Sequence, residues 1–216
     1  AVYHKLANWQ EEWIDEDCYG GRKGYEAAQA VWKVSSEIEE AQLDGGNPLV
    51  LAFIDAAKYF DRMDWAICWK IAEELGCPPQ IIALLRGMYA KIRRRFKIGK
   101  NFGEEWSRPT NGLAQGCPLS MIFANMLGTI WVRVMKERNF RATAFVDDRT
   151  AIVDQKEDMK TIFQVTSQHD TLAGHLINID KSCVATTSKN WRKWLKKLKI
   201  EGTKLQVASD IKLLGT

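Results

Sequence analysis

The sequence predicts an α+β fold, in which helices and strands are interleaved without the regular strand–helix–strand units of a parallel sheet. Three observations support this prediction. The chain has 216 residues and a hydrophobic content of 46%, which is enough to bury a core. Long stretches place apolar residues at the spacing of an amphipathic helix. Short apolar runs between them are bounded by turn residues, as β-strands commonly are.

Apolar periodicity predicts five main helices. They cover residues 25–43, 65–75, 80–90, 118–136 and about 156–176. The first ends at the helix breaker Asp44-Gly45-Gly46. The third and fourth follow Pro79 and Pro118, and proline is well tolerated in a first helical turn because its missing N–H would have no partner there.

Strand-like runs are placed between these helices. They cover residues 48–55, 93–98, 104–107, 142–146 and 150–153. The first is a buried strand that ends at Asp55. The next two predict a hairpin across a glycine-containing turn, and the last two predict another hairpin with an acidic turn at Asp147, Asp148 and Arg149.

The region after residue 178 mixes short strands with a basic run, WRKWLKKLK at 191–199. Its tryptophans and leucines fall on one helical face and its lysines lie opposite. We expect an ordinary core-facing helix with a solvated side. A phosphate-backbone contact is the next alternative, and a membrane surface or a partner protein could also bind such a helix.

Composition argues against several classes of protein. No apolar run approaches the roughly 18 residues of a membrane span, and the polar, acidic N-terminus does not resemble a signal peptide. Five cysteines without a CxxC pair, with only three histidines, argue against a zinc cluster and favour reduced thiols in an intracellular protein, nuclear or cytoplasmic. The net charge of +4 permits a nucleic-acid partner. Because the chain lacks an initiator methionine and stops directly after IKLLGT, we expect a fragment of something longer.

The paired aspartates pose an electrostatic problem. Adjacent carboxylates repel one another, so they need either open water or a cation. A polar turn is the simplest explanation. However, Asp55 also ends an apolar strand, and it could share one acidic pocket with Asp147 and Asp148. Oxygen-only ligands of this kind select Mg²⁺ or Mn²⁺, and a pair of such ions serves in-line phosphoryl transfer.

Six stretches, in order, resemble the motifs of reverse transcriptases. They are CYGGRKGYEAAQAV at 18–31, FIDAAKYFD at 53–61, GLAQGCPLSMIFANM at 112–126, FVDD at 145–148, GHLINIDKS at 174–182 and IKLLGT at 211–216. Together they cover nearly the whole chain. The lysine and the Phe-Asp pair of FIDAAKYFD, and the QGCPLS of the next stretch, are closer to non-LTR retrotransposon and group II intron enzymes than to retroviral ones.

The resemblance implies an RNA-directed DNA polymerase with the palm and fingers of a right-hand polymerase. The antiparallel palm sheet would be flanked by helices, with the thumb absent or lying beyond Thr216. The fingers would be approximately residues 1–48 and 78–112, and the palm residues 49–77 and 113–216. The partners would be an RNA template, a DNA primer and dNTPs, without a membrane. The cofactors would be two Mg²⁺ ions, for which Mn²⁺ could substitute.

The resemblance also implies roles for individual residues near the acidic pocket. Asp55 and Asp147 would be metal ligands, assisted by the backbone carbonyl of Ala56. Asp148 would lie in the same pocket as a weaker partner. Phe60 would be the aromatic gate under the sugar, where a ring leaves no space for a 2′-hydroxyl.

Further roles concern the nucleotide. Arg22, and with it Lys23, would hold the triphosphate through charge-assisted hydrogen bonds. Gln115 and Gly116 would line the nucleotide and template pocket, where glycine permits close approach of the backbone. Lys181 is placed to protonate pyrophosphate as it leaves.

Each role has a simpler alternative. Phe60 could be a core aromatic, Lys181 and Arg22 could be surface charges, and Gln115 could cap a helix. We expect Asp61 and Asp64 to be structural, as acidic groups at the positive N-terminal ends of helices.

The chain departs from the family pattern without losing a metal ligand, so we expect a competent enzyme. Tyr59 replaces the usual small residue beside the gate, and Gly21 replaces a usual aromatic. Two other functions stay open. Asp55 and Asp61 also satisfy the Asp-x5-Asp spacing of an RNA-dependent RNA polymerase, and the domain could bind nucleic acid without catalysis.

Overall fold

The structure, a computed structural model, describes residues 2–43 and 46–208. Its centre is a five-stranded sheet in the order β4-β5-β1-β6-β9. These strands are β1 Val50–Ile54, β4 Arg141–Phe145, β5 Asp148–Val153, β6 Cys183–Thr186 and β9 Gln206–Val207. The first four strands in this order pair antiparallel, and only β9 runs parallel to the strand beside it. The predicted α+β class, with an antiparallel sheet flanked by helices, is confirmed.

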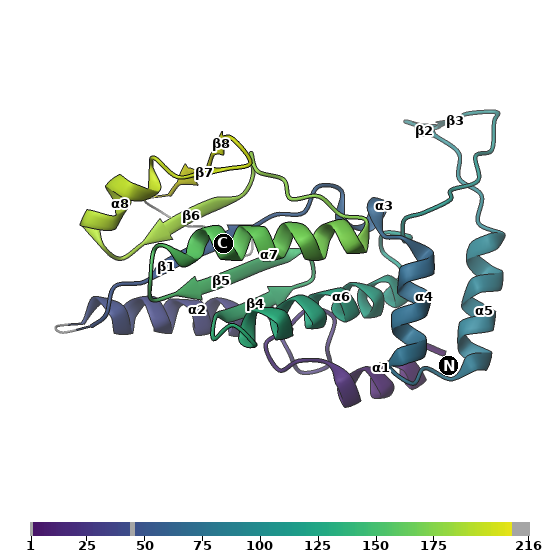
Figure 1. The fold of residues 1–216 in the computed structure, drawn as a ribbon. Helices are drawn as coiled ribbons and strands as arrows, with labels where there is room; N and C mark the ends of the chain where they lie inside the picture. Colours follow the sequence, from purple (N-terminus) through teal and green to yellow (C-terminus); the bar gives the residue numbers. More distant parts are fainter. Residues whose placement is uncertain (1, 44–45, 209–216) are drawn as a thin grey trace.

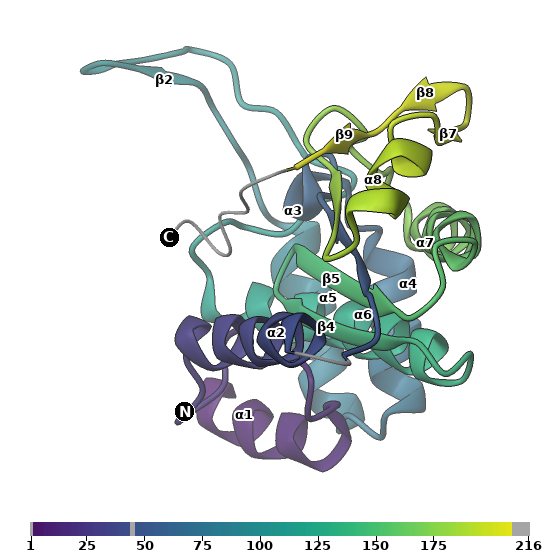
Figure 2. The ribbon, with the colours of Figure 1, turned by 90° about the vertical axis from the view of Figure 1, so that its left-hand side faces the viewer.

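Helices cover both faces of this sheet. They are α1 Val2–Trp13, α2 Ala27–Gln42, α3 Tyr59–Arg62, α4 Trp65–Glu74, α5 Pro79–Ala90, α6 Pro118–Lys136, α7 Asp158–Ala173 and α8 Lys189–Leu195. Two small hairpins are formed by β2 Lys97–Ile98 with β3 Asn101–Phe102 and by β7 Lys199–Ile200 with β8 Thr203–Lys204. Helix α2 lies on one side of the sheet, and α6 and α7 lie on the other (Figure 1, Figure 2). Within the described part of the chain, no helix is long and apolar enough to span a membrane.

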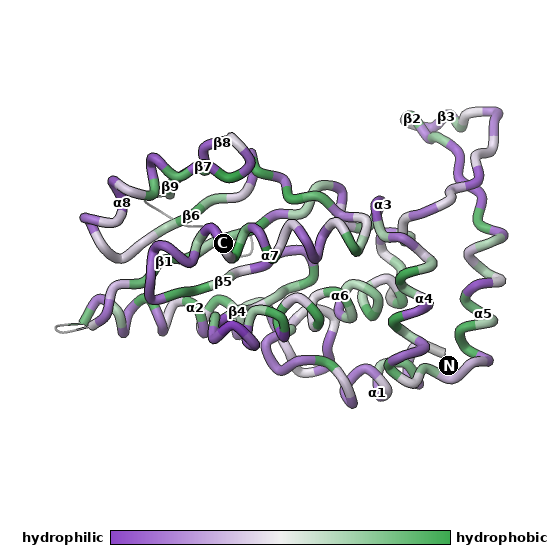
Figure 3. The backbone as a smooth tube through the Cα atoms, viewed as in Figure 1, coloured by the Kyte–Doolittle hydropathy of each residue, from purple (hydrophilic) through white to green (hydrophobic). Residues whose placement is uncertain are grey.

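Side chains of β1 alternate between two cores because successive residues of a strand point to opposite faces. Val50, Ala52 and Ile54 belong to the main core, which includes residues of α6 and α7. Leu51 packs on the other face with Val34 of α2. Figure 3 shows hydrophobic residues along α6, and residues of this helix and of β1 belong to the same main core.

Most predicted elements are confirmed. The helix predicted over 118–136 is α6, and the helices predicted over 25–43, 65–75 and 80–90 are α2, α4 and α5 within two residues at each end. The helix predicted to reach about residue 176 is α7, which ends at Ala173 because Gly174 adopts the left-handed conformation that closes a helix. Asp64 caps α4 through its carboxylate, as expected of a structural residue.

Three predictions need correction. The acidic turn is formed by Val146 and Asp147, and Asp148 already begins β5 because it pairs with Phe145. The first hairpin has only two residues in each strand, with one further bridge between Arg94 and Ser107. The basic helix ends at Leu195 rather than continuing to 199, because the chain turns there into β7. The stretch IKLLGT lies outside the described residues.

Helix α1 was not among the predicted elements. Its buried residues Leu6, Trp9 and Trp13 have the spacing of one helical face, and they pack in the main core. Only two or three residues separate these side chains, and the face that they form packs against α6.

A buried ion pair joins β5 to α7. Both Arg149 guanidinium NH₂ groups donate to the Asp170 carboxylate, at 2.6 and 2.8 Å, and the two side chains are 2% and 1% exposed. The guanidinium also lies 5.5 Å from the ring centroid of Trp131 in α6. His169 contacts the same carboxylate at 3.1 Å. The pair therefore ties the strand that begins with Asp148 to the helical layer behind it.

Replacing Asp170 by asparagine would leave Arg149 buried without its counter-charge. We expect the free energy of unfolding at neutral pH to fall by about 3–5 kcal/mol, measured by urea denaturation. Burial alone would raise the pKa of Asp170, but hydrogen bonds from His169 and Arg149 outweigh it and hold the pKa at about 2. Such a carboxyl stabilises the fold above its unfolded pKa of about 3.9 and loses this effect as pH falls towards 2.

The difference in unfolding free energy between the wild type and Asp170→Asn should therefore shrink between about pH 4 and pH 2. Glu74→Gln, which removes an exposed pair with Lys70, is the matched control and should leave stability unchanged. A difference that is small at neutral pH, or that stays constant through the acid range, would contradict this role of the ion pair.

Candidate active site

The stretch that carries Asp55, FIDAAKYFD, and the stretch that carries Asp147 and Asp148, FVDD, meet at one end of the central sheet. Strands β1 and β5 are antiparallel, with Ile54 opposite Arg149. The next residue along β1 is Asp55, and the residue before Arg149 is Asp148. The register therefore brings Asp55 and Asp148 to the same end of the sheet, with Asp147 in the adjoining turn. We call this end of the sheet the acidic edge.

The turn that carries Asp147 has an unusual backbone. Val146 has a φ of 60°, a left-handed conformation that a β-branched residue rarely adopts. Such a conformation costs free energy and persists only where the surroundings hold it in place. The structure thus contains a strained turn directly beside its acidic residues.

The N-terminal loop supports this turn from behind. The amide of Tyr19 donates to the carbonyl of Ala144, and the amide of Ala144 donates to the carbonyl of Asp17, both at 2.9 Å. A Cβ atom placed on Gly20 would lie 2.4 Å from Val146 Cγ2 and 2.9 Å from its backbone nitrogen. Only glycine therefore allows the loop to pack this closely against the turn.

Side chains from α6 and α2 hold the loop in place. The buried Asn125 side chain donates to the carbonyl of Gly20 at 2.7 Å. Lys136 donates to Asp15 at 2.7 Å and forms an ion pair with Asp17 at the same distance. Lys33 also pairs with Asp17. Contacts to two helices thus make the loop a rigid support.

A second loop holds the backbone of Asp55. The amide of Asp55 donates to the Ser182 hydroxyl at 3.1 Å, and the amide of Asn178 donates to the Asp55 carbonyl at 2.9 Å. The Ser182 hydroxyl in turn donates to the Asn178 carbonyl at 2.8 Å. Lys181 is part of this loop and its side chain is exposed. The loop therefore brings Lys181 into the neighbourhood of Asp55.

The carboxylates influence one another electrostatically. Burial raises the pKa of Asp147 above its ordinary value, and the charge of Asp55 raises it further. Burial also raises the pKa of Asp148, with the charges of Asp147 and Asp55 acting in the same direction. Negative charge is thus unfavourable at this edge unless a cation or donor compensates it.

The chemistry of the acidic edge fits a divalent metal held in an open site. Among residues 2–43 and 46–208, no group of three histidine, cysteine, aspartate or glutamate side chains is arranged so that it could hold a metal ion by itself. A site for Mg²⁺ does not require one, because this ion is commonly bound by one or two carboxylates and by substrate phosphates. The mutual repulsion of Asp55, Asp147 and Asp148 is the kind that such an ion relieves. The residues fit a divalent ion held in an open site rather than in a cage.

Phe60 and the loop at 112–116 are connected through the backbone. The amide of Leu113 donates to the carbonyl of Phe60 at 2.7 Å, and the amide of Gly112 donates to the carbonyl of Met63 at 2.8 Å. Phe60 itself is only half-buried. Gln115 and Gly116, in the same loop, are exposed, and Gly116 has a φ of 80° with open space beside it.

Tyr59 is the buried neighbour of Phe60. Its ring lies 5.6 Å from Phe60 and 4.4 Å from His175, and its hydroxyl donates to the carbonyl of Ala124 in α6 at 3.2 Å. Burial lowers the pKa of His175 to about 4, so this ring is neutral at physiological pH. Tyr59 therefore fills the space behind Phe60 and links three segments of the site.

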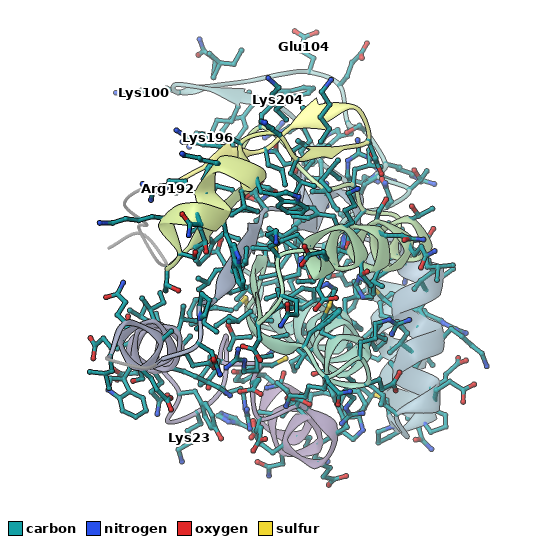
Figure 4. All side chains as sticks on the ribbon, turned by 60° about the vertical axis from the view of Figure 1, so that its left-hand side comes forward. Lys23, Lys100, Glu104, Arg192, Lys196 and Lys204 are labelled. Atoms are coloured by element: carbon teal, nitrogen blue, oxygen red, sulfur yellow. The ribbon has the colours of Figure 1, made fainter. Side chains whose placement is uncertain are left out.

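Arg22 has intramolecular partners. Its guanidinium donates to Glu11 at 2.7 Å and to the carbonyl of Cys18 at 2.9 Å, and it stacks 3.8 Å from the ring centroid of Tyr25. Its side chain is 6% exposed. A phosphate contact would require it to leave these partners. Lys23, next to it, is exposed near α1 and α2 (Figure 4).

Some residues that organise the site were not identified from the sequence. Gly20 and Ser182 act on the backbone of the acidic segments, and Asn125 acts on the loop of Gly20. The glycine pair in CYGGRKG was a signal of close packing, and the serine at the end of GHLINIDKS adjoins Lys181. The partners of these residues, however, lie more than 100 positions away.

Comparisons with known proteins agree with this arrangement. Residues 2–216 match the family model described as reverse transcriptase (RNA-dependent DNA polymerase). Similar folds occur in telomerase from Candida albicans in complex with a TWJ fragment of telomeric RNA, at 15% identity and a TM-score of 0.68, over 85% of this chain and 34% of that chain. Telomerase from Candida tropicalis with the same kind of RNA fragment gives 14% identity and a TM-score of 0.67, over 87% of this chain and 33% of that chain. The chain thus has their palm and fingers fold and spans about a third of their length.

Adding a methyl group at Gly20 should disturb the acidic turn. We expect Gly20→Ala to lower the free energy of unfolding by about 1–3 kcal/mol, since the new Cβ overlaps Val146. The amide NMR shifts of Val146 and Asp147 should also change. The matched control is Gly87→Ala in α5, where a Cβ meets nothing within 4 Å and alanine should be neutral or stabilising. Unchanged shifts at Val146 and Asp147 would show that the turn does not depend on Gly20.

Proposed function

The chain belongs to the reverse transcriptase family, and we propose from this membership that it adds deoxynucleotides to the 3′-hydroxyl of a DNA primer paired with an RNA template. The observation that carries the proposal is the meeting of Asp55 with Asp147 and Asp148 at one end of the sheet. Residues about 90 positions apart in sequence thus form one acidic edge. An acidic edge of this kind suits a reaction between a hydroxyl group and a nucleotide triphosphate, in which divalent ions compensate negative charge.

In the proposed reaction the primer 3′-oxygen attacks the α-phosphorus of the dNTP. A new phosphodiester bond forms, the bond to the pyrophosphate oxygen breaks, and the hydroxyl proton passes to solvent water. Asp55 and Asp147, with the carbonyl of Ala56, would hold the divalent ions, and Asp148 would add charge in the same pocket. When bound, Mg²⁺ would lower the pKa of the primer hydroxyl and would stabilise the negative charge on the leaving pyrophosphate.

The chain's other residues would bind and select the substrate. Lys181 would donate a proton to the departing pyrophosphate, supported by its place in the loop that holds Asp55. Gln115 and Gly116 would line the nucleotide and template pocket, supported by the open space beside Gly116. Phosphate binding by Lys23 is compatible with its exposure, whereas Arg22 would first have to release Glu11.

We also infer an origin in a non-LTR retrotransposon. This is supported by Lys58 and the Phe60-Asp61 pair of the first acidic stretch and by the Gln-Gly-Cys-Pro-Leu-Ser run before α6. The intact acidic residues favour an active enzyme over a domain that only binds nucleic acid.

Removing one carboxylate should abolish extension. We expect Asp147→Asn to lower the rate of primer extension on an RNA template with dNTPs and Mg²⁺ by at least about 10³-fold, because a metal ion contributes several kcal/mol to such a transition state. The assay uses the chain together with any segment that its gene encodes after Thr216.

The control for this experiment is Asp61→Asn, which removes an exposed neighbouring carboxylate. It should keep most of the activity. Extension by Asp147→Asn at the wild-type rate would refute the proposed role. Loss of extension in Asp61→Asn, together with use of rNTPs by the wild type, would favour an RNA polymerase instead.

Shortening the side chain of Phe60 should weaken sugar selection. We expect Phe60→Val to reduce the preference for dNTPs over rNTPs by about 10–100-fold, because space opens for a 2′-hydroxyl. The ratio of kcat/KM values for one dNTP and its rNTP measures this preference. Tyr59→Phe removes only a hydroxyl behind the gate and should keep the ratio. If Phe60→Val kept the wild-type ratio, a residue other than Phe60 would be responsible for selecting the sugar.

A further inference from the structure

One hairpin extends from the body of the molecule. The basic hairpin, residues 91–108, follows α5 and contains β2 and β3, and it projects away from the sheet and its helices (Figure 1, Figure 2). Its two sides are joined by backbone pairs between Arg94 and Ser107, at 2.9 and 2.8 Å, and by the short β2–β3 ladder. The tip thus has regular backbone pairing but no core of its own.

The basic hairpin exposes large apolar side chains to an unusual degree. Phe96 and Ile98 are 84% and 82% exposed, and Phe102 and Trp106 are 52% and 54% exposed. Four of the ten large hydrophobic side chains that are exposed in the described part of the chain lie in this short segment. An exposed cluster of this kind commonly marks an interaction surface.

Cations surround these rings. The segment holds seven lysine and arginine residues and two glutamates, whereas the whole chain has a net charge of only +4. A second basic segment, at 189–204, contains α8 and β8. Figure 4 shows Lys100 and Glu104 at the far end of the hairpin, Arg192 on α8 and Lys196 directly after this helix.

The rings and cations of the basic hairpin are stacked on each other. The guanidinium of Arg95 lies 4.4 Å from the ring centroid of Phe102 and 4.7 Å from that of Trp106. The ammonium of Lys97 lies 5.4 Å from the Phe102 ring. Alternating aromatic and guanidinium planes are surfaces on which unpaired bases stack, while nearby cations contact the phosphates.

The base of the hairpin adjoins the candidate active site. The Arg94 guanidinium donates to the carbonyl of Gly112 at 3.4 Å, and Gly112 begins the loop that carries Gln115 and Gly116. A strand lying along the hairpin would therefore lead towards the pocket proposed for the template.

We propose that the basic hairpin binds single-stranded RNA, as an arm that holds the template strand outside the active site. A single strand is favoured over a duplex because only unpaired bases present their faces for stacking. Nucleic acid is favoured over a protein partner because the phosphates of a strand offer a counter-charge to each of the seven cations along the hairpin. The proposal names a binding surface for the template of the proposed function and rests on that function for the identity of the strand.

The test measures binding of a fluorescent single-stranded RNA without dNTPs or divalent ions, as a function of salt. Arg93→Gln with Lys100→Gln removes two exposed cations, and the slope of log K against log salt should become shallower by about 0.7 for each phosphate that the variant no longer neutralises. Phe96→Ser should weaken binding by about 5–100-fold with little change in slope, because one base no longer stacks on the hairpin. The matched control is Lys193→Gln in α8 with Lys196→Gln directly after it, and it should change both the affinity and the salt slope less than the hairpin variants do.

A direct probe reports on the hairpin itself. In protein labelled with 5-fluorotryptophan, the Trp106 resonance, assigned by Trp106→Phe, should shift when the RNA is added. Binding that is unchanged in both hairpin variants, or that leaves this resonance in place, would overturn the proposal. The proposal would also be overturned if sedimentation showed a dimer that is lost in the hairpin variants. The same holds if the hairpin variants lost binding to anionic vesicles while their RNA binding stayed unchanged.

The outcome is separable from that of the proposed function. Hairpin-dependent RNA binding by a chain that never extends a primer would support the arm and count against the polymerase. Extension that requires Asp147 but is accompanied by normal RNA binding in the hairpin variants would support the polymerase and overturn the arm.

Discussion

The position of β5 is the constraint on which the acidic site depends, and the Arg149–Asp170 ion pair is the interaction that secures it. The pair is almost fully buried and couples the strand directly after Asp148 to α7. A buried guanidinium needs its carboxylate, so β5 cannot shift along the sheet without exposing or unpairing a charge. The same register sets Ile54 opposite Arg149 and hence Asp55 beside the acidic turn.

Two loops then act on the backbone of the site rather than on its carboxylates. The loop at 17–20 packs against Val146 and keeps a strained turn in place, while the loop at 178–182 accepts and donates hydrogen bonds at Asp55. Because both loops contact the main chain, the carboxylate oxygens of the aspartates stay available to other partners. This arrangement suits the proposed function, in which the carboxylates hold divalent ions beside a nucleotide.

Negative and positive charges lie in different parts of the molecule. Acidic groups are gathered at the end of the central strands, whereas much of the positive charge lies in the hairpin at 91–108 and around α8. Basic segments attract a polyanion and a bare acidic cluster repels it, so in the proposed function divalent ions would let a nucleic acid approach the carboxylates.

The sequence by itself determined the α+β class, the bounds of α6, the strand that delivers Asp55 and, through the order of its motifs, the reverse transcriptase family. These features are local, because helical spacing, proline positions and short motifs can be recognised within a few residues. The tertiary structure alone decided that Arg149 pairs with Asp170, that Gly20 lies against Val146, and that Arg22 is engaged with Glu11. These contacts join separate elements, and their partners depend on how the elements pack rather than on any local pattern.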